Sequence, residues 1–169
     1  MELLPEIENR QSIRKFTNKT VNKEQLKRIV EAGRRAPSAK NRQPWRFVVI
    51  TDQELKEKIK VAAFNQEYVS EAGAIIAACS TNIDYRMPNG QLSHPIDISF
   101  AMAFMMLQAV HEGLGTCVIT TFDEQEVKDM LTVPHSMRVI LLLLVGHTAE
   151  TPFPESRKSF ERISVFNHW

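Results

Sequence analysis

Residues 95–112 read Pro95-Ile96-Asp97-Ile98-Ser99-Phe100-Ala101-Met102-Ala103-Phe104-Met105-Met106-Leu107-Gln108-Ala109-Val110-His111-Glu112, and they are apolar on almost every side. Their length, with glycines at 113 and 115 as a stop, favours a helix over a strand. A helix without a polar face has to be covered all round. A chain of 169 residues can hardly do this alone. The segment therefore predicts a core helix that packs against a second subunit.

Shorter elements alternate on both sides of this segment. The patterns predict helices over residues 2–10, 23–36, about 52–64 and 124–131, and strands over 47–50, 74–79, 116–121 and 139–145. Asn22, Asp52 (or Thr51) and Asp123 are suitable N-caps. Alternating strands and helices indicate helices packed on a sheet, in an α/β or α+β sandwich that forms one domain over residues 1–169.

Charge is distributed unevenly along the chain. The net charge is only +1, but residues 1–50 contain 12 Lys/Arg against 5 Asp/Glu, and residues 51–169 contain 9 against 15. A basic N-terminal third suggests an anionic partner, which could be nucleic acid, a membrane surface or a phosphorylated small molecule. A solvated basic face is the alternative. Cys79 and Cys117 lie in apolar runs and are expected to be small buried hydrophobes.

The sequence favours a soluble, cytoplasmic protein. Glu2, Glu6 and Glu8 argue against a signal peptide at the start. The apolar run from Ile96 to Val110 is too short to span a bilayer.

Two polar segments flank the first long helical pattern. The first is Arg10-Gln11-Ser12-Ile13-Arg14-Lys15-Phe16, and the second is Pro37-Ser38-Ala39-Lys40-Asn41-Arg42-Gln43-Pro44-Trp45. In an extended chain Arg10, Ser12 and Arg14 share one face, which suits a phosphomonoester. The second segment offers amide and hydroxyl groups that could meet a planar ring. Either segment could instead be a polar turn in water.

The common catalytic and nucleotide-binding motifs are missing. The chain contains no G-x-G-x-x-G, no Walker A lysine and no G-x-S-x-G elbow, and its five histidines lack zinc-ligand spacing. We therefore expect no metal site and no protein nucleophile. Side chains would have to hold any phosphate, and a bound cofactor would carry the chemistry.

The order of these segments resembles the FMN-dependent nitroreductase family of homodimeric NAD(P)H:acceptor oxidoreductases, over nearly the whole chain. Residues 10–16 are similar to its R-x-S-x-R-x-F opening, and residues 37–45 to its P-S-x-x-N-x-Q-P-W signature. Residues 113–123 resemble its G-L-G-T-x-x-I-x-x-F-D segment, and Val145-Gly146-His147 resembles its strand-ending glycine. The resemblance implies an α+β fold. This is a three-layer α-β-α sandwich with a mainly antiparallel sheet and a C-terminal tail exchanged with the partner subunit.

The resemblance also implies the residues of an FMN site. Arg10, Ser12, Arg14 and the tail's Arg157 would bind the phosphate and ribityl chain, with Gln11 against the flavin. Asn65, Thr120 and Thr121 would lie beside the ring. Four residues of the other subunit would complete the site, namely Pro37, Ser38, Ala39 and Asn41. No side chain is implied as catalytic, because flavin N5 does the chemistry.

Three features depart from the family pattern. Glu155 stands where some members have a basic residue near the phosphate, and Thr121 replaces a glycine near N5. The loop over residues 84–95 leaves little room for a substrate lid.

The expected function is FMN-dependent oxidation of NAD(P)H with ping-pong reduction of an electron-poor acceptor, such as a nitroaromatic or a quinone. The expected assembly is a homodimer with FMN at the subunit interface, with no nucleic acid or membrane partner. Three alternatives stay open: another reaction of the family such as reductive dehalogenation, a non-catalytic flavin carrier or sensor, and nucleic-acid binding, which ranks last.

Overall fold

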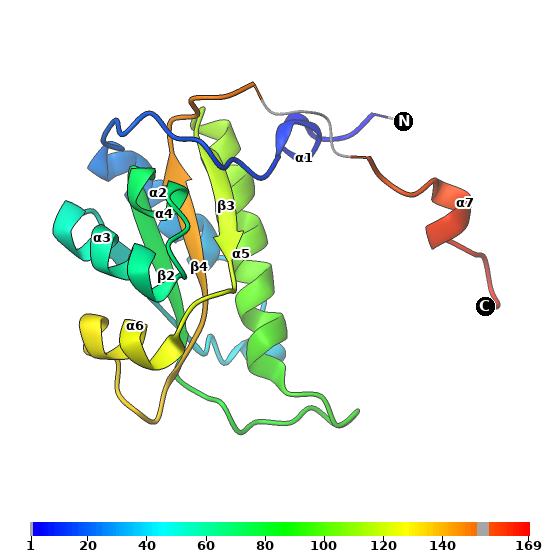
Figure 1. The fold of residues 1–169 in the computed structure, drawn as a ribbon. Helices are drawn as coiled ribbons and strands as arrows, with labels where there is room; N and C mark the ends of the chain where they lie inside the picture. Colours follow the sequence, from blue (N-terminus) through cyan, green and yellow to red (C-terminus); the bar gives the residue numbers. More distant parts are fainter. Residues whose placement is uncertain (1, 152–155) are drawn as a thin grey trace.

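The computed structural model describes residues 2–151 and 156–169 (Figure 1). Its central sheet has four strands, which are β1 (Trp45–Ile50), β2 (Ala74–Ser80), β3 (Gly115–Ile119) and β4 (Arg138–Gly146). The strand order is β1-β2-β4-β3, and each neighbouring pair is antiparallel. β1 and β3 are therefore the two outer strands of the sheet.

Helices cover both faces of this sheet. One face carries α2 (Lys23–Arg34) and α5 (Ser93–His111), and the other carries α3 (Gln53–Ala62), α4 (Tyr68–Glu71) and α6 (Glu124–Leu131). Successive residues of β2 face opposite cores: Ile75 packs with the second group and Ile76 with the first. The predicted three-layer α-β-α sandwich with an antiparallel sheet is confirmed.

Three shorter helical elements lie outside the layers. α1 (Pro5–Asn9) lies against the C-terminal end of α5, η1 (Ala39–Asn41) is a single 3-10 turn, and α7 (Phe160–Ile163) lies in the tail. None of η1, α4 and α7 was predicted, because three or four residues are too few to show a helical repeat.

Local signals in the sequence set the helix starts. Asn22 Oδ1 accepts a hydrogen bond from Glu24 N (2.8 Å), and Asp52 and Asp123 accept from backbone N–H groups of α3 and α6, as predicted. α2 ends two residues earlier than predicted, because a residue before proline disfavours helical backbone, and Ala36 precedes Pro37. α5 begins two residues earlier, since Pro95 occupies the first turn, where no N–H is needed.

The predicted core assignments agree with the structure. Cys79 and Cys117 are buried in β2 and β3, which β4 separates. No helix in the described parts of the chain is long and apolar enough to cross a membrane.

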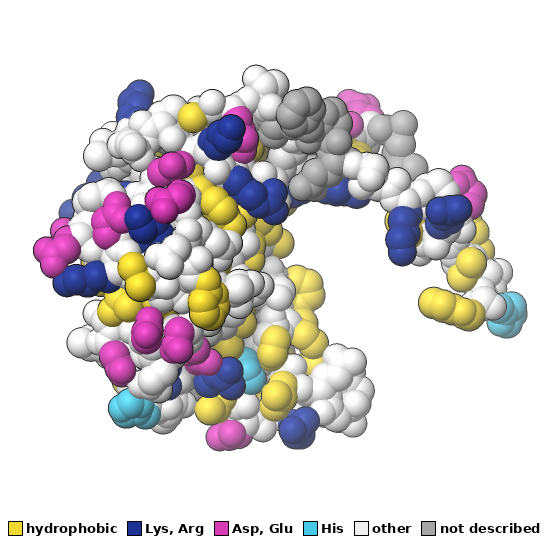
Figure 2. All heavy atoms as spheres, viewed as in Figure 1, with side chains coloured by type: hydrophobic (Ala, Val, Ile, Leu, Met, Phe, Trp, Pro, Cys, Tyr) yellow, Lys and Arg dark blue, Asp and Glu magenta, His cyan; other side chains and the backbone are white. Residues whose placement is uncertain are grey.

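The long helix α5 is covered by its own chain on one side only. Ile98, Met102 and Met105 are buried under the sheet, whereas Phe100 and Phe104 are 47% and 40% exposed. Figure 2 shows hydrophobic side chains on the side of the body that faces the hollow beside the tail. Residues 156–169 extend away from the body (Figure 1, orange to red). Both α5 and the tail therefore present apolar surface that this chain does not cover.

Candidate functional site

The first polar segment lies along the outer strand β3. Ser12 forms an isolated parallel bridge with Thr116, and Ile13 N donates to Thr116 O (2.9 Å). Ile13 also fills the space in front of Gly115, where an added Cβ would lie 2.6 Å from Ile13 Cγ1. Because residue 115 has no side chain, the segment can approach the strand closely.

Two buried polar groups, one on this segment and one on the neighbouring strand β3, lack a hydrogen-bond partner among the described residues. Gln11 Oε1 and Thr116 Oγ1 are buried and have no hydrogen-bond partner within residues 2–151 and 156–169. A buried acceptor without a donor is costly, so it indicates a missing partner that carries O–H or N–H groups. FMN carries such groups on its ribityl chain and ring, and the residues present therefore fit this cofactor.

The two arginines of the segment have different surroundings. Arg10 is half-buried directly after α1, and its N–H donates to Glu6 O (3.1 Å). Arg14 is exposed, and within the described residues its guanidinium has no carboxylate partner, although its backbone N–H donates to Glu150 Oε1 (2.8 Å). An exposed cation held on an anchored backbone can receive an anionic ligand.

A second group of predicted residues lies at the other end of β3. Thr120 and Thr121 directly follow the strand, and both are exposed. Gln66 Nε2 donates to Thr121 O (3.3 Å) and to Ala63 O (2.9 Å). Asn65, exposed and left-handed (φ 58°), is therefore held beside Thr121.

Gln66 was not among the predicted site residues. The one available signal was its position next to Asn65.

The second polar segment forms a strained loop. Lys40, Asn41 and Gln43 all have left-handed backbone, with φ of 54°, 53° and 50°. Two hydrogen bonds hold them: Gln43 N donates to Ser38 Oγ (2.9 Å), and Ala39 N donates to Asp97 Oδ1 (2.8 Å). Strain of this kind persists only where the surroundings enforce it, and it is concentrated at functional sites.

Asp97 belongs to a buried polar pair on the first turns of α5. His94 and Asp97 are 5% and 3% exposed, and His94 Nδ1 and Asp97 Oδ2 find no partner among the described residues. Burial, and secondarily the charge of Arg138, lowers the pKa of His94. Neither residue was predicted to have a role, although Asp97 is the one acidic residue between Pro95 and Val110.

One chain does not bring the two polar segments together. Asp97 holds the loop of residues 38–43 at the N-terminal end of α5, whereas α1 and the segment after it lie at the C-terminal end, where Glu6 pairs with His111 (2.9 Å). Asp97 and His111 are fourteen positions apart on α5, which corresponds to about 21 Å of helix. Arg157 belongs to the tail of residues 156–169, which extends away from the body, and Glu155 lies outside the described residues.

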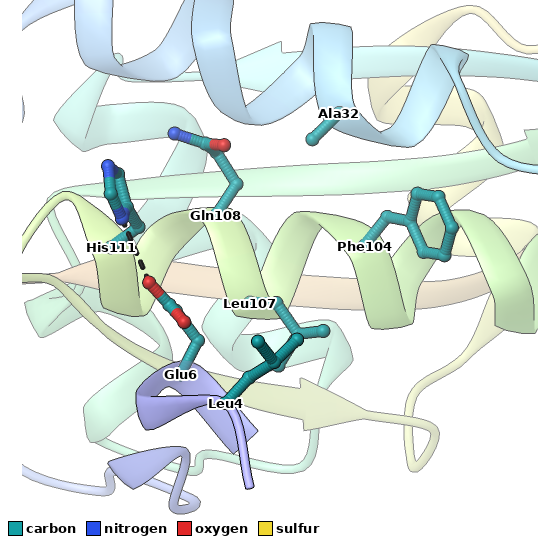
Figure 3. Close-up of a pocket in the computed structure, with 7 residues that line it drawn as sticks. All are labelled: Leu4, Glu6, Ala32, Phe104, Leu107, Gln108 and His111. Atoms are coloured by element: carbon teal, nitrogen blue, oxygen red, sulfur yellow. Dashed lines mark hydrogen bonds and ion pairs between the residues drawn. The ribbon is translucent and has the colours of Figure 1, made fainter. Parts of the chain in front are cut away.

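An apolar groove runs along the exposed side of α5 (Figure 3). Leu4 from the chain before α1, Ala32 from α2, and Phe104 and Leu107 from α5 line it, and the Glu6–His111 pair closes one end. Its volume is about 460 Å³. Its lining contains few polar groups, so it suits apolar protein surface rather than a phosphorylated cofactor.

Known proteins resemble the chain over most of its length. It is 29% identical to an NADH dehydrogenase of Thermus thermophilus (93% of this chain, 92% of the relative) and 34% identical to an oxygen-insensitive NADPH nitroreductase of Helicobacter pylori (80% and 81%). It is 26% identical to an FMN reductase [NAD(P)H] of Bacillus subtilis (96% and 72%). An iodotyrosine deiodinase of Haliscomenobacter hydrossis is 25% identical (85% and 78%).

Solved structures agree with these relatives. A nitroreductase family protein of Clostridium novyi superposes with a TM-score of 0.82 at 32% identity (89% of this chain, 87% of the other). One of Clostridium difficile superposes with a TM-score of 0.88 at 26% identity, over the full length of both chains. The model of the nitroreductase family matches residues 7–68 and 60–147. These matches confirm the predicted family and fold, and the protein belongs to the nitroreductase family.

Proposed function

We propose that the protein is an FMN-dependent oxidoreductase that uses NAD(P)H to reduce an electron-poor acceptor. The family and the names of the NAD(P)H-using relatives support this activity. The observation that carries the proposal is the unsatisfied Gln11 Oε1 beside Ser12 on an anchored basic segment. This is the arrangement that a phosphorylated cofactor with polar hydrogens requires.

We assign the FMN site to two groups of residues. One subunit supplies a phosphate grip from Arg10, Ser12 and Arg14, and polar contacts to the ring from Gln11, Asn65, Thr120 and Thr121. The other subunit supplies the loop with Pro37, Ser38, Ala39 and Asn41. Arg157 joins the phosphate grip from the tail. About 21 Å of α5 separates the two polar segments in one chain, so we propose that each of them meets its counterpart from the other subunit.

The homodimer proposal rests on apolar surface that lacks cover. Phe100, Phe104 and the groove of Figure 3 form one side, and the tail exposes Phe160, Ile163 and Phe166 by 51–81%. Val49 on the outer strand β1 is 39% exposed, and it lines a groove of about 750 Å³. Two copies that pack through α5 and exchange tails would bury all three surfaces.

The protein's contribution to the reaction is to bind and orient the cofactor. FMN, when bound, supplies the hydride transfer and the electron storage. The cationic side chains hold the phosphate, while Asn65 and the threonine backbone position the ring edge. No side chain of the site is required as a general acid or base. Donor and acceptor would use the same opening in turn, which predicts ping-pong kinetics.

The test begins with colour and flavin content. The purified protein should be yellow with one FMN per subunit, and NADH or NADPH should bleach it anaerobically. Parallel lines in double-reciprocal plots are expected when donor and acceptor are varied together. A flavin that no nicotinamide reduces would favour a carrier or sensor instead, and a colourless protein that takes up no FMN would refute the proposal.

Arg14→Ala tests the phosphate grip, and Lys15→Ala is its matched control. Both remove one exposed cation from the same segment, but neighbouring side chains of an extended chain point to opposite sides. Arg14→Ala should weaken FMN binding about ten- to hundredfold, the value of one charge-assisted contact. Lys15→Ala should bind FMN as the wild type does. Equal losses in the two variants would mean that general charge, and not a phosphate site, holds the flavin.

Reductive dehalogenation is the second candidate. The similarity to an iodotyrosine deiodinase favours it, whereas the short loop between β2 and α5 offers little material for a lid. Turnover of halogenated phenols by the reduced protein, measured beside a nitroaromatic, distinguishes the two activities.

A further inference from the structure

Two cations of the strained loop stack on one aromatic ring. The guanidinium carbon of Arg42 lies 3.5 Å from the ring centroid of Tyr85, and Lys40 Nζ lies 5.7 Å from it. Both side chains are exposed, and Tyr85 belongs to the loop between β2 and α5. Cation–π contacts hold the two charges at defined positions. The Arg42 hydrogen bond and both cationic charges lower the pKa of the Tyr85 hydroxyl, which agrees with their closeness.

These cations lack the carboxylate partners that other surface cations have. Arg28, Arg34 and Arg138 each form an ion pair of 2.6–2.7 Å. Within the described residues no such pair forms for Lys40 or Arg42. Asp84, which precedes Tyr85 in the sequence, forms no ion pair with either of them there. The cluster of Lys40, Arg42 and Tyr85 is thus a concentrated positive surface.

The backbone fixes this cluster in place. Lys40 lies between Ala39, whose N–H is bound by Asp97, and Asn41, and Arg42 precedes Gln43, whose N–H is bound by Ser38. A mobile surface lysine would contribute little selectivity, whereas a charge on a pinned loop favours ligands that carry the opposite charge at one position. Ala39 and Asn41 are also assigned to the FMN site of the partner subunit, so the cluster borders its opening.

We propose that Lys40, Arg42 and Tyr85 form an anion-recognition site that makes the enzyme selective for a redox substrate with a phosphate or carboxylate group. This inference rests on the proposed function, and it names the substrate class of that site. Two sources of the anion share this chemistry: the 2′-phosphate of NADPH on the donor side, and a carboxylate on the acceptor side. The two guanidinium N–H groups and the ammonium would bind the anion directly.

The experiment compares, in the FMN-loaded dimer, two pairs of substrates whose members differ by one anionic group. The donor arm uses NADPH and NADH, and the acceptor arm uses 4-nitrobenzoate and 4-nitrobenzamide. Arg42→Gln and Lys40→Met keep most of the side-chain volume. Each should raise KM about ten- to hundredfold for the member of one pair that carries the extra anionic group, as expected for loss of one charge-assisted contact. The member without that group should change less than about twofold.

Lys58→Ala is the control, because Lys58 pairs with Glu54 on α3 and lies outside the proposed site. It should leave all four substrates unchanged. A larger KM for NADPH alone identifies the donor phosphate, and one for 4-nitrobenzoate alone identifies an acidic acceptor. Equal effects on both members of each pair, or no effect on any of the four substrates, overturn the proposal.

A second measurement needs no variant. In the wild-type enzyme, raising the salt concentration should increase KM for the member of a pair that carries the extra anionic group more than for its counterpart. Parallel salt responses would contradict the proposal. Failure of the proposed function would give a different result from both outcomes. In that case the wild-type protein would bind no FMN, or neither NADH nor NADPH would reduce its flavin.

Discussion

Asp97→Ala removes the contact that holds the strained loop to α5. In the structure the Asp97 carboxylate is 3% exposed and accepts one hydrogen bond, from Ala39 N at 2.8 Å. Its second oxygen has no partner among the described residues. The variant therefore frees a backbone N–H of the loop and also eliminates a buried charge.

Loss of the hydrogen bond destabilises the fold, whereas removal of the buried charge stabilises it. The two changes do not oppose each other in their effect on cofactor binding. A hydrogen bond to a charged group stabilises by about 1.5–3 kcal/mol. Left-handed backbone at Lys40, Asn41 and Gln43 costs about 1–2 kcal/mol per residue, so loss of the contact should release the loop. Removing an incompletely satisfied buried carboxylate offsets part of the global loss. We expect a melting temperature of the FMN-free protein within a few degrees of wild type, and FMN affinity about 10- to 150-fold weaker.

Quenching of FMN fluorescence on titration with FMN-free protein measures this affinity. Asp97→Asn retains an acceptor oxygen without the charge and should fall between wild type and Asp97→Ala. Ser99→Ala is the control on the same helix, because the Ser99 hydroxyl is exposed and bonds only its own helix at Pro95 O (2.7 Å). Unchanged FMN affinity in Asp97→Ala, with the same melting temperature, would refute the role of the loop in cofactor binding.

Three further perturbations test separate parts of the structure. Gly115→Ala would place a Cβ 2.6 Å from Ile13 Cγ1, so it should displace the segment with Ser12 and weaken FMN binding at least tenfold in the same titration. Arg28 lowers the pKa of Glu112 from 4.5 to about 2, so this ion pair stabilises the fold above pH 4.5 and loses its contribution as the pH falls towards about 2. In urea unfolding, Glu112→Gln should be less stable than wild type at pH 6, and the difference should shrink by pH 3; a constant difference would exclude this linkage. Phe104→Asp should yield monomers that retain no FMN in sedimentation and absorbance measurements, and a dimeric yellow variant would contradict the assignment of the α5 surface to the subunit interface.

Much of the fold could be predicted because its signals are local. The side chain of Asn22 caps the helix that begins at the next residue, and Pro37 ends the same helix from three residues away. The apolar run over residues 96–110 predicted a helix that one chain could not cover, and Phe100 and Phe104 remain exposed in the structure. The short helices α4 and α7 were missed, since four residues are too few to show a helical repeat. The antiparallel direction of the strands was predicted from the family resemblance, because alternation of strands and helices does not determine it. The strand order was not predicted.

The sequence by itself determined the chemical character of the candidate site: two polar segments, a basic N-terminal third, and the order of motifs that identifies the family. The tertiary structure alone decided which groups meet. Ala39 contacts Asp97 across 58 residues and Gln66 contacts Thr121 across 55, and neither contact leaves a pattern in the sequence. It also decided that the two polar segments lie at opposite ends of α5. The physical reason is that caps, turns and amphipathic faces depend on neighbouring residues, whereas hydrogen bonds between distant segments depend on how helices pack on the sheet.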